Sequence, residues 1–409
     1  MKIIHEECAG IDAHKKTAVT TVRKGEDQTP RTFGTMTSDL LALSDWLLLE
    51  GITHVAIEST GEFWKPIYNI LESNFEVILV NAQHIKQVPG RKTEVKDAEW
   101  LAELLQQGLL KPRFIPPIAQ RELGDLTRYR STFIRERATV VNRVQKVLED
   151  ANIKLASVAS DVMGVAGRAM LDALVAGASD PATLADLAKG KLREKQDQLV
   201  KALDGRMKPH HQFVLAELLG QIDSLEAVIA RFNEHIQQAC VPFEPAVVIL
   251  DTIPGVARQA ADTMVAEMGV DMSRFPSADH LSAWAGVAPG NYESAGKRKS
   301  GKTRKGNRVL RTILVQAAHA ATRTKGTYLS ALYRRIAARR GKKKAILAVA
   351  HAILVSAYYM LLRMEPYREV GSQYFDQIRP EQTAKRLVKH LERLGFSVTL
   401  QSPTARAAA

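Results

Sequence analysis

The stretch CAGIDAHKKTAVTTVRKG, from Cys8 to Gly25, determines how the N-terminal part of the chain folds. A small, largely apolar run leads to the polar triplet His14-Lys15-Lys16, and a run rich in Thr and Val follows it. Such runs on either side of a short polar segment are typical of two strands joined by a turn. We therefore expect the first domain to begin with a strand, a turn and a second strand.

The residues after this stretch continue with short segments of both kinds. RTFGTMT, residues 31–37, is a candidate third strand, and HVAIEST and FEVILVNA are further short strand-like runs. Helical periodicity appears in DLLALSDWLLLEG, which ends at Gly51, in the segment from Trp64 to Leu71, and in DAEWLAELLQQG, from Asp97 to Gly108. Three early strands followed by alternating helices and strands predict an α/β domain with a mixed sheet layered by helices.

A proline-rich segment, KPRFIPP from Lys111 to Pro117, predicts a linker after this domain. Beyond it, Ile134, Val141 and Leu148 recur every seven residues. A second apolar seam follows the 4-3 spacing of a heptad repeat, at Leu218, Ile222, Leu225, Ile229, Phe232 and Ile236. These seams predict two long antiparallel helices that pack on each other or on another subunit. We expect domains at 1–115, 116–241 and 242–375, with a helical or disordered tail at 376–409.

The charge of the chain is concentrated in one block. The 409 residues carry a net charge of +13 and a pI near 9.6. Between Ser294 and Met364 lie 18 Lys or Arg residues and no Asp or Glu, whereas the rest of the chain has more acidic than basic residues. This block predicts an acidic polymer as partner. No membrane partner is expected, because we find no apolar run of roughly 18 residues, no signal peptide and no lipidation signal.

The two cysteines, Cys8 and Cys240, are too few for a disulfide framework or a zinc cluster. We therefore expect a cytoplasmic protein with unreactive thiols. The 11 histidines show no zinc-binding pattern, and the absence of a Walker loop argues against ATP as a cofactor.

Carboxylates at the ends of two predicted strands are candidate metal ligands. Asp12 ends the first strand in AGIDAHKK, and Glu58 ends a later strand in AIESTGE. Glu94 and Asp97, three residues apart in GRKTEVKDAEW, could converge on the same point. Four carboxylates with water and phosphate oxygens form a ligand set that suits Mg²⁺, and paired Mg²⁺ ions can activate a phosphodiester. The alternative is that Asp12 caps a turn, Glu58 is a surface acid and Asp97 caps a helix.

The segment GNYESAGKRKSGKTRKGNRVLR, residues 290–311, is the most basic part of the chain. Its glycines predict a flexible loop that follows a nucleic-acid backbone, with phosphate-binding side chains at Lys297, Arg298, Lys299, Lys302, Arg304, Lys305, Arg308 and Arg311. Ser294 is a candidate nucleophile among these cations, and Ser300 has similar surroundings. Upstream, IPGV followed by an amphipathic helix resembles a helix-hairpin-helix element. Gly255 would then expose N–H groups to a phosphate, or it forms a turn between structural helices.

Together, GIDAHKK, IESTGEFW, GRKTEVKDAEWLAELL and AWAGVAPGNYESAGKRKSGKTRKGNRVLR resemble the DEDD-type insertion-sequence transposases related to the Piv-type DNA invertase. The resemblance spans residues 8–375 with the motifs in the family's order. It implies an N-terminal RuvC-like domain of ribonuclease H type, a helical coiled-coil segment and a mainly α C-terminal transposase domain. The family's acidic positions fall on Asp12, Glu58, Glu94 and Asp97. The third is usually Asp, so Glu94 departs from the pattern by one methylene group.

The same resemblance implies a mechanism and partners. Its serine nucleophile falls on Ser294, five residues after Pro289. This serine would hold a DNA strand as a phosphoserine ester while Mg²⁺ carboxylates activate it. Members of the family are guided by a structured non-coding bridge RNA that pairs with donor and target DNA, and a homotetramer would be the working assembly. A RuvC-like nuclease or junction resolvase without a covalent intermediate, an inactive nucleic-acid-binding protein and an actin-like ATPase are the alternatives.

Overall fold

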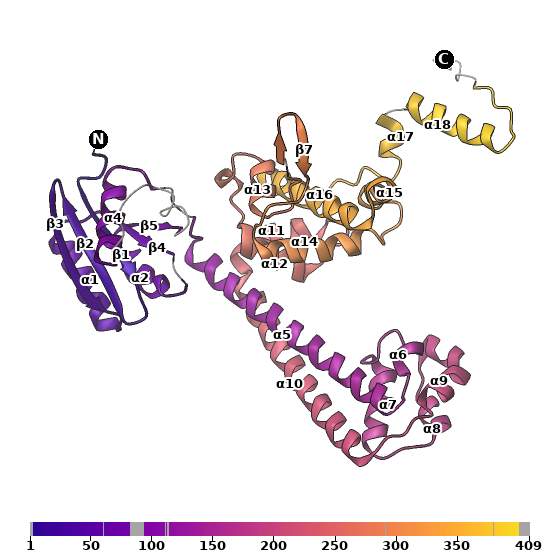
Figure 1. Cartoon of the computed structure of the whole chain (residues 1–409). Helices are drawn as coiled ribbons and strands as arrows, with labels where there is room; N and C mark the ends of the chain where they lie inside the picture. Colours follow the sequence, from indigo (N-terminus) through magenta and orange to yellow (C-terminus); the bar gives the residue numbers. More distant parts are fainter. Residues whose placement is uncertain are drawn as a thin grey trace. The chain divides into compact units, whose positions relative to one another are not determined.

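The computed structural model describes residues 3–59, 61–81, 94–110, 112, 114–290, 292–378 and 380–400; the side chains of 94–96, 292, 298, 299 and 386 lie outside this description. The chain divides into two compact units, Met1–Pro116 and Pro117–Ala409 (Figure 1). Each unit has its own hydrophobic core, so each is described separately.

The first unit is built on a mixed five-stranded sheet. Its strands are β1 (Glu7–Ala13), β2 (Thr17–Lys24), β3 (Asp27–Gly34), β4 (His54–Glu58) and β5 (Glu76–Val80). The order across the sheet is β3-β2-β1-β4-β5. β1, β2 and β3 pair antiparallel, whereas β1, β4 and β5 pair parallel. The predicted mixed sheet is therefore confirmed, and with its helices it forms a ribonuclease H-like domain.

Helices cover both faces of this sheet. On one face α1 (Thr37–Leu49) and α2 (Trp64–Leu71) bury apolar side chains against Ile11 and Ile57. On the other face α4 (Glu94–Gln106) packs Leu105 against Cys8 and Ala56. Because neighbouring residues in a strand point to opposite faces, the even-numbered positions of β1 and β4 face α4.

The second unit is mostly helical, as expected, and begins with a long helical pair. α5 (Ile118–Asp150) and α10 (Pro209–Ala239) run antiparallel, since Arg137 pairs with Glu226 and Asp150 with His211. Along the predicted seam of α10, Ile222 and Ile236 are buried and the other four residues are half-buried. On α5 the predicted phase is wrong at one point: Ile134 is 40% exposed, and the buried positions are Val140, Val144 and Leu148.

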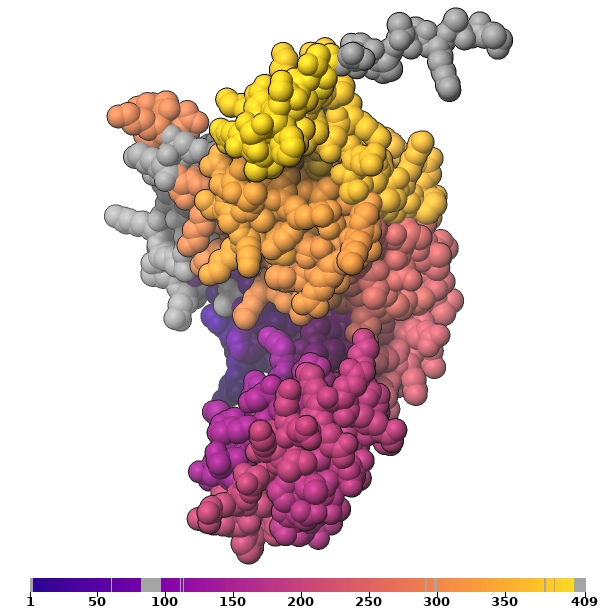
Figure 2. Space-filling model, turned by 90° about the vertical axis from the view of Figure 1, so that its right-hand side faces the viewer, coloured from indigo at the N-terminus to yellow at the C-terminus, as the bar shows by residue number. Residues whose placement is uncertain are grey.

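Short helices enclose a small core at one end of this pair. They are α6 (Leu155–Val158), α7 (Val165–Val175), α8 (Pro181–Ala185), the 3-10 helix η1 (Gly190–Lys195) and α9 (Gln196–Leu203). Figure 2 shows this magenta part as a lobe distinct from the orange C-terminal core of the same unit.

The C-terminal core consists of helices joined by short turns. They are η2 (Val241–Phe243), α11 (Glu244–Asp251), α12 (Arg258–Met268), η3 (Met272–Arg274), α13 (Ala278–Trp284), α14 (Arg308–Ala321), α15 (Tyr328–Arg340) and α16 (Lys342–Arg363). Two further helices, α17 (Tyr374–Ile378) and α18 (Pro380–Arg393), follow this core.

Helix α16 corrects one expectation from the sequence. It contains a window of 18 residues that is long and apolar enough to cross a membrane, although no such run was expected. However, 56% of that window is buried inside the fold, where Val349, Ile353 and Leu354 contact the other helices of the core. α16 is therefore the central helix of the C-terminal core, and its apolar character follows from that position.

Candidate active site

Two carboxylates lie side by side where β1 and β4 end. The parallel register pairs Ile11 with Ile57, so the next residues, Asp12 and Glu58, are neighbours at the carboxyl ends of adjacent strands. Both belong to the set of alternating positions that face α4. Parallel pairing thus brings together two acids that are 46 positions apart in the sequence.

A glycine allows α4 to approach these strand ends. A Cβ atom at Gly10 would overlap the carbonyl oxygen of Ala98 and lie 2.5 Å from the backbone nitrogen of Ala102. Asp97 directly precedes Ala98 and therefore reaches the end of β1 on the same face as Asp12. Because α4 begins at Glu94, Asp97 lies within the helix, so the alternative that it caps the helix is wrong.

The electrostatics show that two neighbouring carboxylates act on Asp12. Asp12 is only 7% exposed, and burial raises the pKa of its carboxyl group. His14, whose Nε2 lies 3.1 Å from the Asp12 Oδ2, lowers this pKa, whereas the charges of Glu58 and Asp97 raise it. A buried carboxylate with two like charges nearby is poorly stabilised by the protein itself. This donor set fits a hard divalent cation.

The position of the fourth predicted acid, Glu94, relative to the other three is not described. The backbone of Glu94 belongs to α4, but its side chain lies outside the described residues. Among the described residues, the oxygens of Asp12, Glu58 and Asp97 do not form a group within 4.8 Å of one another. Glu58 and Asp97 are therefore close enough to Asp12 to raise its pKa, but the ligand oxygens of the three acids are not all within 4.8 Å of one another.

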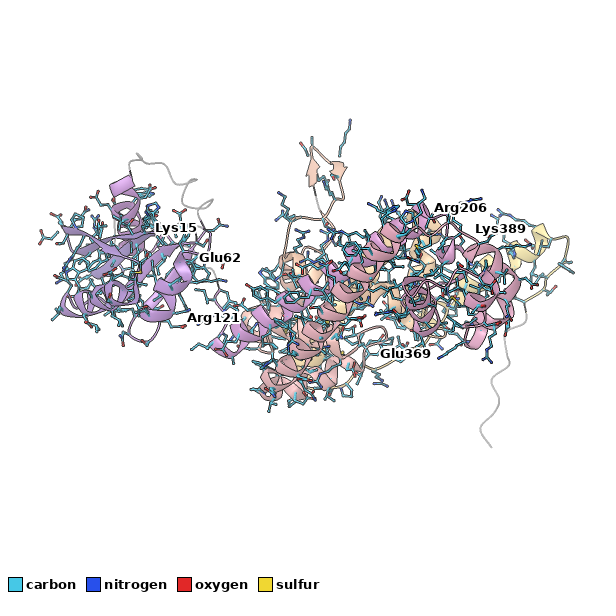
Figure 3. The ribbon with its side chains drawn as sticks, turned by 90° about the horizontal axis from the view of Figure 1, so that it is seen from below. Lys15, Glu62, Arg121, Arg206, Glu369 and Lys389 are labelled. Atoms are coloured by element: carbon cyan, nitrogen blue, oxygen red, sulfur yellow. The ribbon has the colours of Figure 1, made fainter. Side chains whose placement is uncertain are left out.

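A small hollow is lined by residues of α1, α2 and the turn after β1. Its volume is about 230 Å³, and it is lined by His14, Lys15, Thr35, Leu40, Glu62, Phe63, Pro66 and Ile67. Figure 3 labels Lys15 and Glu62 in this unit. His14 lines the hollow and contacts Asp12, but Asp12, Glu58 and Asp97 do not line it.

In the second unit, Ser294 lies at the tip of a β-hairpin. β6 (Tyr292–Ser294) and β7 (Lys297–Ser300) pair antiparallel, with Ser294 opposite Lys297. Ala295 and Gly296 form the two-residue turn, with φ values of 52° and 70°. Positive φ at both central residues is the type I′ turn, which matches the twist of a hairpin. The prediction of a flexible loop is therefore wrong for residues 292–300, and Figure 1 shows the hairpin projecting from the helices.

Close backbone contacts fix the base of this hairpin. A Cβ atom at Gly286 would lie 2.9 Å from the backbone nitrogen of Gly306. Asn307 caps α14 through a hydrogen bond from the Leu310 N–H, and its Nδ2 donates to Glu267 at 2.5 Å. The buried carboxylate of Glu267 also accepts hydrogen bonds from Arg128 of α5.

The roles of Glu267 and Asn307 were not predicted from the sequence. An Asn before an apolar periodic segment is a recognised helix start, so the cap at Asn307 had a signal in the sequence. The contact with Glu267 had none, because it joins residues 40 positions apart.

The two candidate serines differ in their surroundings. Ser294 is exposed beside the turn, whereas Ser300 ends β7 and its hydroxyl accepts a hydrogen bond from the Lys302 N–H. Both serines are exposed, but only the Ser300 hydroxyl has a hydrogen-bond partner among the bonds found for these two side chains in the described residues.

Most of the predicted phosphate-binding cations surround this hairpin or follow it. The structure leaves five of them exposed and without an ion pair to any described residue: Lys297, Lys302, Arg304, Lys305 and Arg308. Arg311 is half-buried on α14, which begins at Arg308, so these two arginines are helical and not part of a loop. The side chains of Arg298 and Lys299 lie outside the described residues.

Gly255 has a packing role that explains its conformation. Its φ is 86°, and a Cβ atom there would overlap the backbone of α14 at Ala317 and Ala321. The nearby Arg258, at the start of α12, donates to both carboxylate oxygens of Glu244 at 2.6 Å. The turn is therefore accounted for by helix packing, and phosphate binding at Gly255 stays a prediction.

One cluster of an acid and two histidines has the residue types of a metal site, but its hydrogen bonds do not suit a metal. Among the described residues, Asp150, His210 and His211 have ligand atoms within 4.8 Å of one another. However, the Lys208 N–H donates to Nδ1 of His211 at 3.3 Å, which leaves Nε2 protonated and able to donate to Asp150 at 2.8 Å. This tautomer ties the ends of α5 and α10 together and leaves His211 without a lone pair for a metal.

Both thiols are buried, as expected for unreactive cysteines. Burial raises the pKa of Cys8 to about 11 and that of Cys240 to about 12.

A ribonuclease H-like domain with acids at its strand ends, followed by a cationic helical unit, indicates an enzyme that acts on nucleic acid. A family model of DEDD transposases of the IS110 type matches residues 9–153, and a model described as "Transposase IS116/IS110/IS902 family" matches residues 247–334. Together the two models cover more than half of the chain. The chain belongs to the IS110 family of DEDD transposases, enzymes that transfer phosphoryl groups of DNA during transposition of an insertion sequence.

Two curated relatives agree with this assignment. The "Probable family 20 transposase" of Pseudomonas aeruginosa is 26% identical over 66% of this chain and 71% of its own length. The "Transposase for insertion sequence element IS1111A" of Coxiella burnetii is 25% identical over 71% of this chain and 72% of its own. The predicted family and enzyme class are therefore confirmed. Families of this DEDD nuclease type use divalent metals.

Proposed function

We propose that this transposase cuts and rejoins DNA through a phosphoserine ester at Ser294. The observation that carries the proposal is the exposed position of Ser294 on a type I′ hairpin, among cations that have no acidic partner among the described residues. The rigid base at Gly286, Gly306 and Asn307 supports a nucleophile that must be presented to a DNA strand. Residues on a fixed scaffold meet a reacting atom at less entropic cost than residues on a mobile loop.

The reaction itself exchanges one phosphodiester for another. The Ser294 oxygen would attack a DNA phosphorus while the bond from that phosphorus to one deoxyribose oxygen breaks. The departing sugar oxygen would take up a proton, and the serine would lose one. Attack on the phosphoserine by a hydroxyl of another strand would reverse these steps and release Ser294. The number of phosphoester bonds is unchanged, so no ATP is needed.

Charges on both units would support this exchange. Lys297, opposite Ser294 in the hairpin, and the cations after it would stabilise the negative charge that builds up on the phosphate oxygens. Asp12, Glu58 and Asp97, with Glu94, would hold Mg²⁺, which when bound would favour the serine alkoxide and stabilise the same charge. Like-charge repulsion at Asp12 supports this ligand assignment.

The remaining assignments complete the proposal. Residues 1–115 would form the RuvC-like catalytic domain, 116–241 the coiled coil and 242–375 the domain that carries Ser294. The basic surface would bind a structured bridge RNA as well as donor and target DNA, and base pairing would select the sites. Four copies would assemble in the cytoplasm, partly through α5 and α10. Mass photometry that found only monomers on DNA, or protein purified free of RNA yet fully active, would contradict these points.

The covalent step can be tested with a nicked DNA substrate whose cleavage releases a short strand and prevents rejoining. With Mg²⁺, the unmodified protein should give a DNA–protein adduct that survives detergent, and Ser294→Ala should give none. Ser300→Ala serves as the matched control and should retain the adduct, because that hydroxyl is held at the base of the hairpin. Unchanged cleavage by Ser294→Ala would instead support a metal-dependent nuclease without a covalent intermediate.

A further inference from the structure

Five cations gather where α15 meets α16, away in sequence from the serine hairpin. We name them the basic corner: Arg339, Arg340, Lys342, Lys343 and Lys344. α15 ends at Arg340 and α16 begins at Lys342, with Gly341 between them at a φ of 84°. This left-handed turn lets the two helices follow each other directly, so all five side chains emerge within one short segment.

The basic corner is exposed and its charge is not neutralised. All five residues are exposed, and none forms an ion pair with a described residue. No acidic residue occurs anywhere between Ser294 and Met364. In Figure 2 the orange part of the chain, which includes α15 and the start of α16, lies at the surface of the view.

The three lysines lie at a position that the fold does not favour. They occupy the first turn of α16, which has no acidic residue and no side-chain cap. The free N–H groups of a helix N-terminus already carry partial positive charge, so cations there are destabilising. The stability of α16 therefore does not explain why three consecutive lysines occur at its start. A partner with negative charge would explain them.

We propose that the basic corner is a second DNA-binding surface, which holds the backbone of duplex DNA outside the segment that Ser294 cleaves. A duplex presents closely spaced phosphates along both strands, which suits a compact group of flexible cations. Single-stranded RNA is usually held by aromatic side chains that stack on its bases. Residues 339–344, which form the basic corner, contain no aromatic residue, so the chemistry of the corner fits duplex phosphates better.

Removing the three lysines should change how binding depends on salt. Each phosphate contact contributes about 0.9 to the slope of log affinity against log salt concentration. Lys342→Gln/Lys343→Gln/Lys344→Gln should therefore lower this slope by roughly 2 to 3 and weaken duplex binding at moderate salt by about tenfold. Fluorescence anisotropy with a labelled duplex, measured over a salt series, gives both quantities.

A second triple variant controls for the loss of charge. Lys189→Gln/Lys191→Gln/Lys201→Gln removes three exposed lysines from the small helical lobe and should leave the slope nearly unchanged. Circular dichroism should show that both variants keep their helices. Equal salt slopes in the two variants would overturn the proposal, as would a loss of affinity confined to a structured RNA. The readout is binding and not cleavage, so this test can fail or succeed independently of the proposed serine chemistry.

Discussion

Asp12 is a proposed metal ligand whose burial lowers the stability of the metal-free fold when its carboxyl group is ionised. It ends an apolar strand, is almost fully buried and has Glu58 and Asp97 as neighbours. Burial raises its pKa, so the folded state favours the protonated form. The stability contribution of this group is therefore complete below its ordinary pKa of about 4 and is lost as the pH rises through the raised value. Above its raised pKa, the ionised Asp12 destabilises the metal-free protein.

Replacing Asp12 by Asn should accordingly raise the melting temperature of the metal-free protein. The variant keeps the shape of the side chain but lacks the charge that is repelled by Glu58 and Asp97. It should also lose most of the stabilisation that Mg²⁺ gives to the unmodified protein. Thermal unfolding at pH 7.5, with EDTA and with Mg²⁺, measures both effects. A variant that is less stable in EDTA and still responds fully to Mg²⁺ would show that Asp12 is not a ligand.

Arg130, unlike Asp12, is a buried charge that lies beside a buried group of opposite charge. Its side chain is 3% exposed and lies 3.5 Å from the equally buried Asp262 of α12. It also donates to the hydroxyl of Thr263 and the carbonyl oxygen of Gln259. These contacts attach α5 to the core that supports the serine hairpin.

Arg130→Met should lower the free energy of unfolding of the second unit by about 1.5 to 3 kcal/mol, because buried Asp262 loses one of its two arginine partners and keeps only Arg258, at 3.0 Å. Arg137→Met is the control, since Arg137 lies on the same helix as Arg130 but forms a more exposed pair, with Glu226 of α10. That change should cost less than about 1 kcal/mol. Urea unfolding followed by circular dichroism compares the two variants. Similar costs would mean that the Arg130 network adds nothing beyond an ordinary surface pair.

Among the elements, α4 decides whether the acids meet. It packs against β1 at Gly10 so closely that no side chain fits between them. Asp97 depends on this approach, because it directly precedes the residue whose carbonyl oxygen lies over the glycine.

Gly10→Ala should therefore displace α4 and move Asp97 away from Asp12. Overpacking of this kind costs about 1 to 3 kcal/mol. Unfolding of the first unit by urea should show this loss, and the Mg²⁺ concentration needed for half-maximal cleavage should rise. Gly220→Ala is a control for the substitution itself, because a Cβ atom at Gly220 meets nothing within 4 Å. An unchanged metal requirement in Gly10→Ala would mean that the position of α4 does not matter for the site.

Some of the strands and helices could be predicted from the sequence, and others could not. Local patterns predicted β1, β2, α1 and α2, since each has a clear periodicity and a turn or glycine at its end. The start of α4 at Glu94 was missed because Asp97, a residue type favoured at helix starts, was taken as the first residue of the helix although it lies inside it. The hairpin was missed because Ala-Gly is not a usual type I′ pair and the flanking lysines have little preference for strands. The proximity of Asp12, Glu58 and Asp97 needed the parallel register and the contact at Gly10, neither of which is a local property.

At the scale of the whole molecule, the residues proposed to bind metal and those proposed to bind and attack DNA lie in different units of the chain. The acids belong to the unit Met1–Pro116, and Ser294, the proposed nucleophile, and the cations belong to Pro117–Ala409. The division falls in the proline-rich segment between them. The account therefore requires that a carboxylate group and a serine from separate units act on the same DNA phosphate.

Mass spectrometry of the DNA–protein adduct, after digestion by protease and nuclease, tests this requirement most directly. The account predicts a single modified peptide in which one nucleotide is attached to Ser294. It also predicts that the peptide is absent when Mg²⁺ is removed or when Asp12 is replaced by Asn. A nucleotide on Ser300 or on any other residue, or an adduct on Ser294 that forms equally well without the acids, would contradict it.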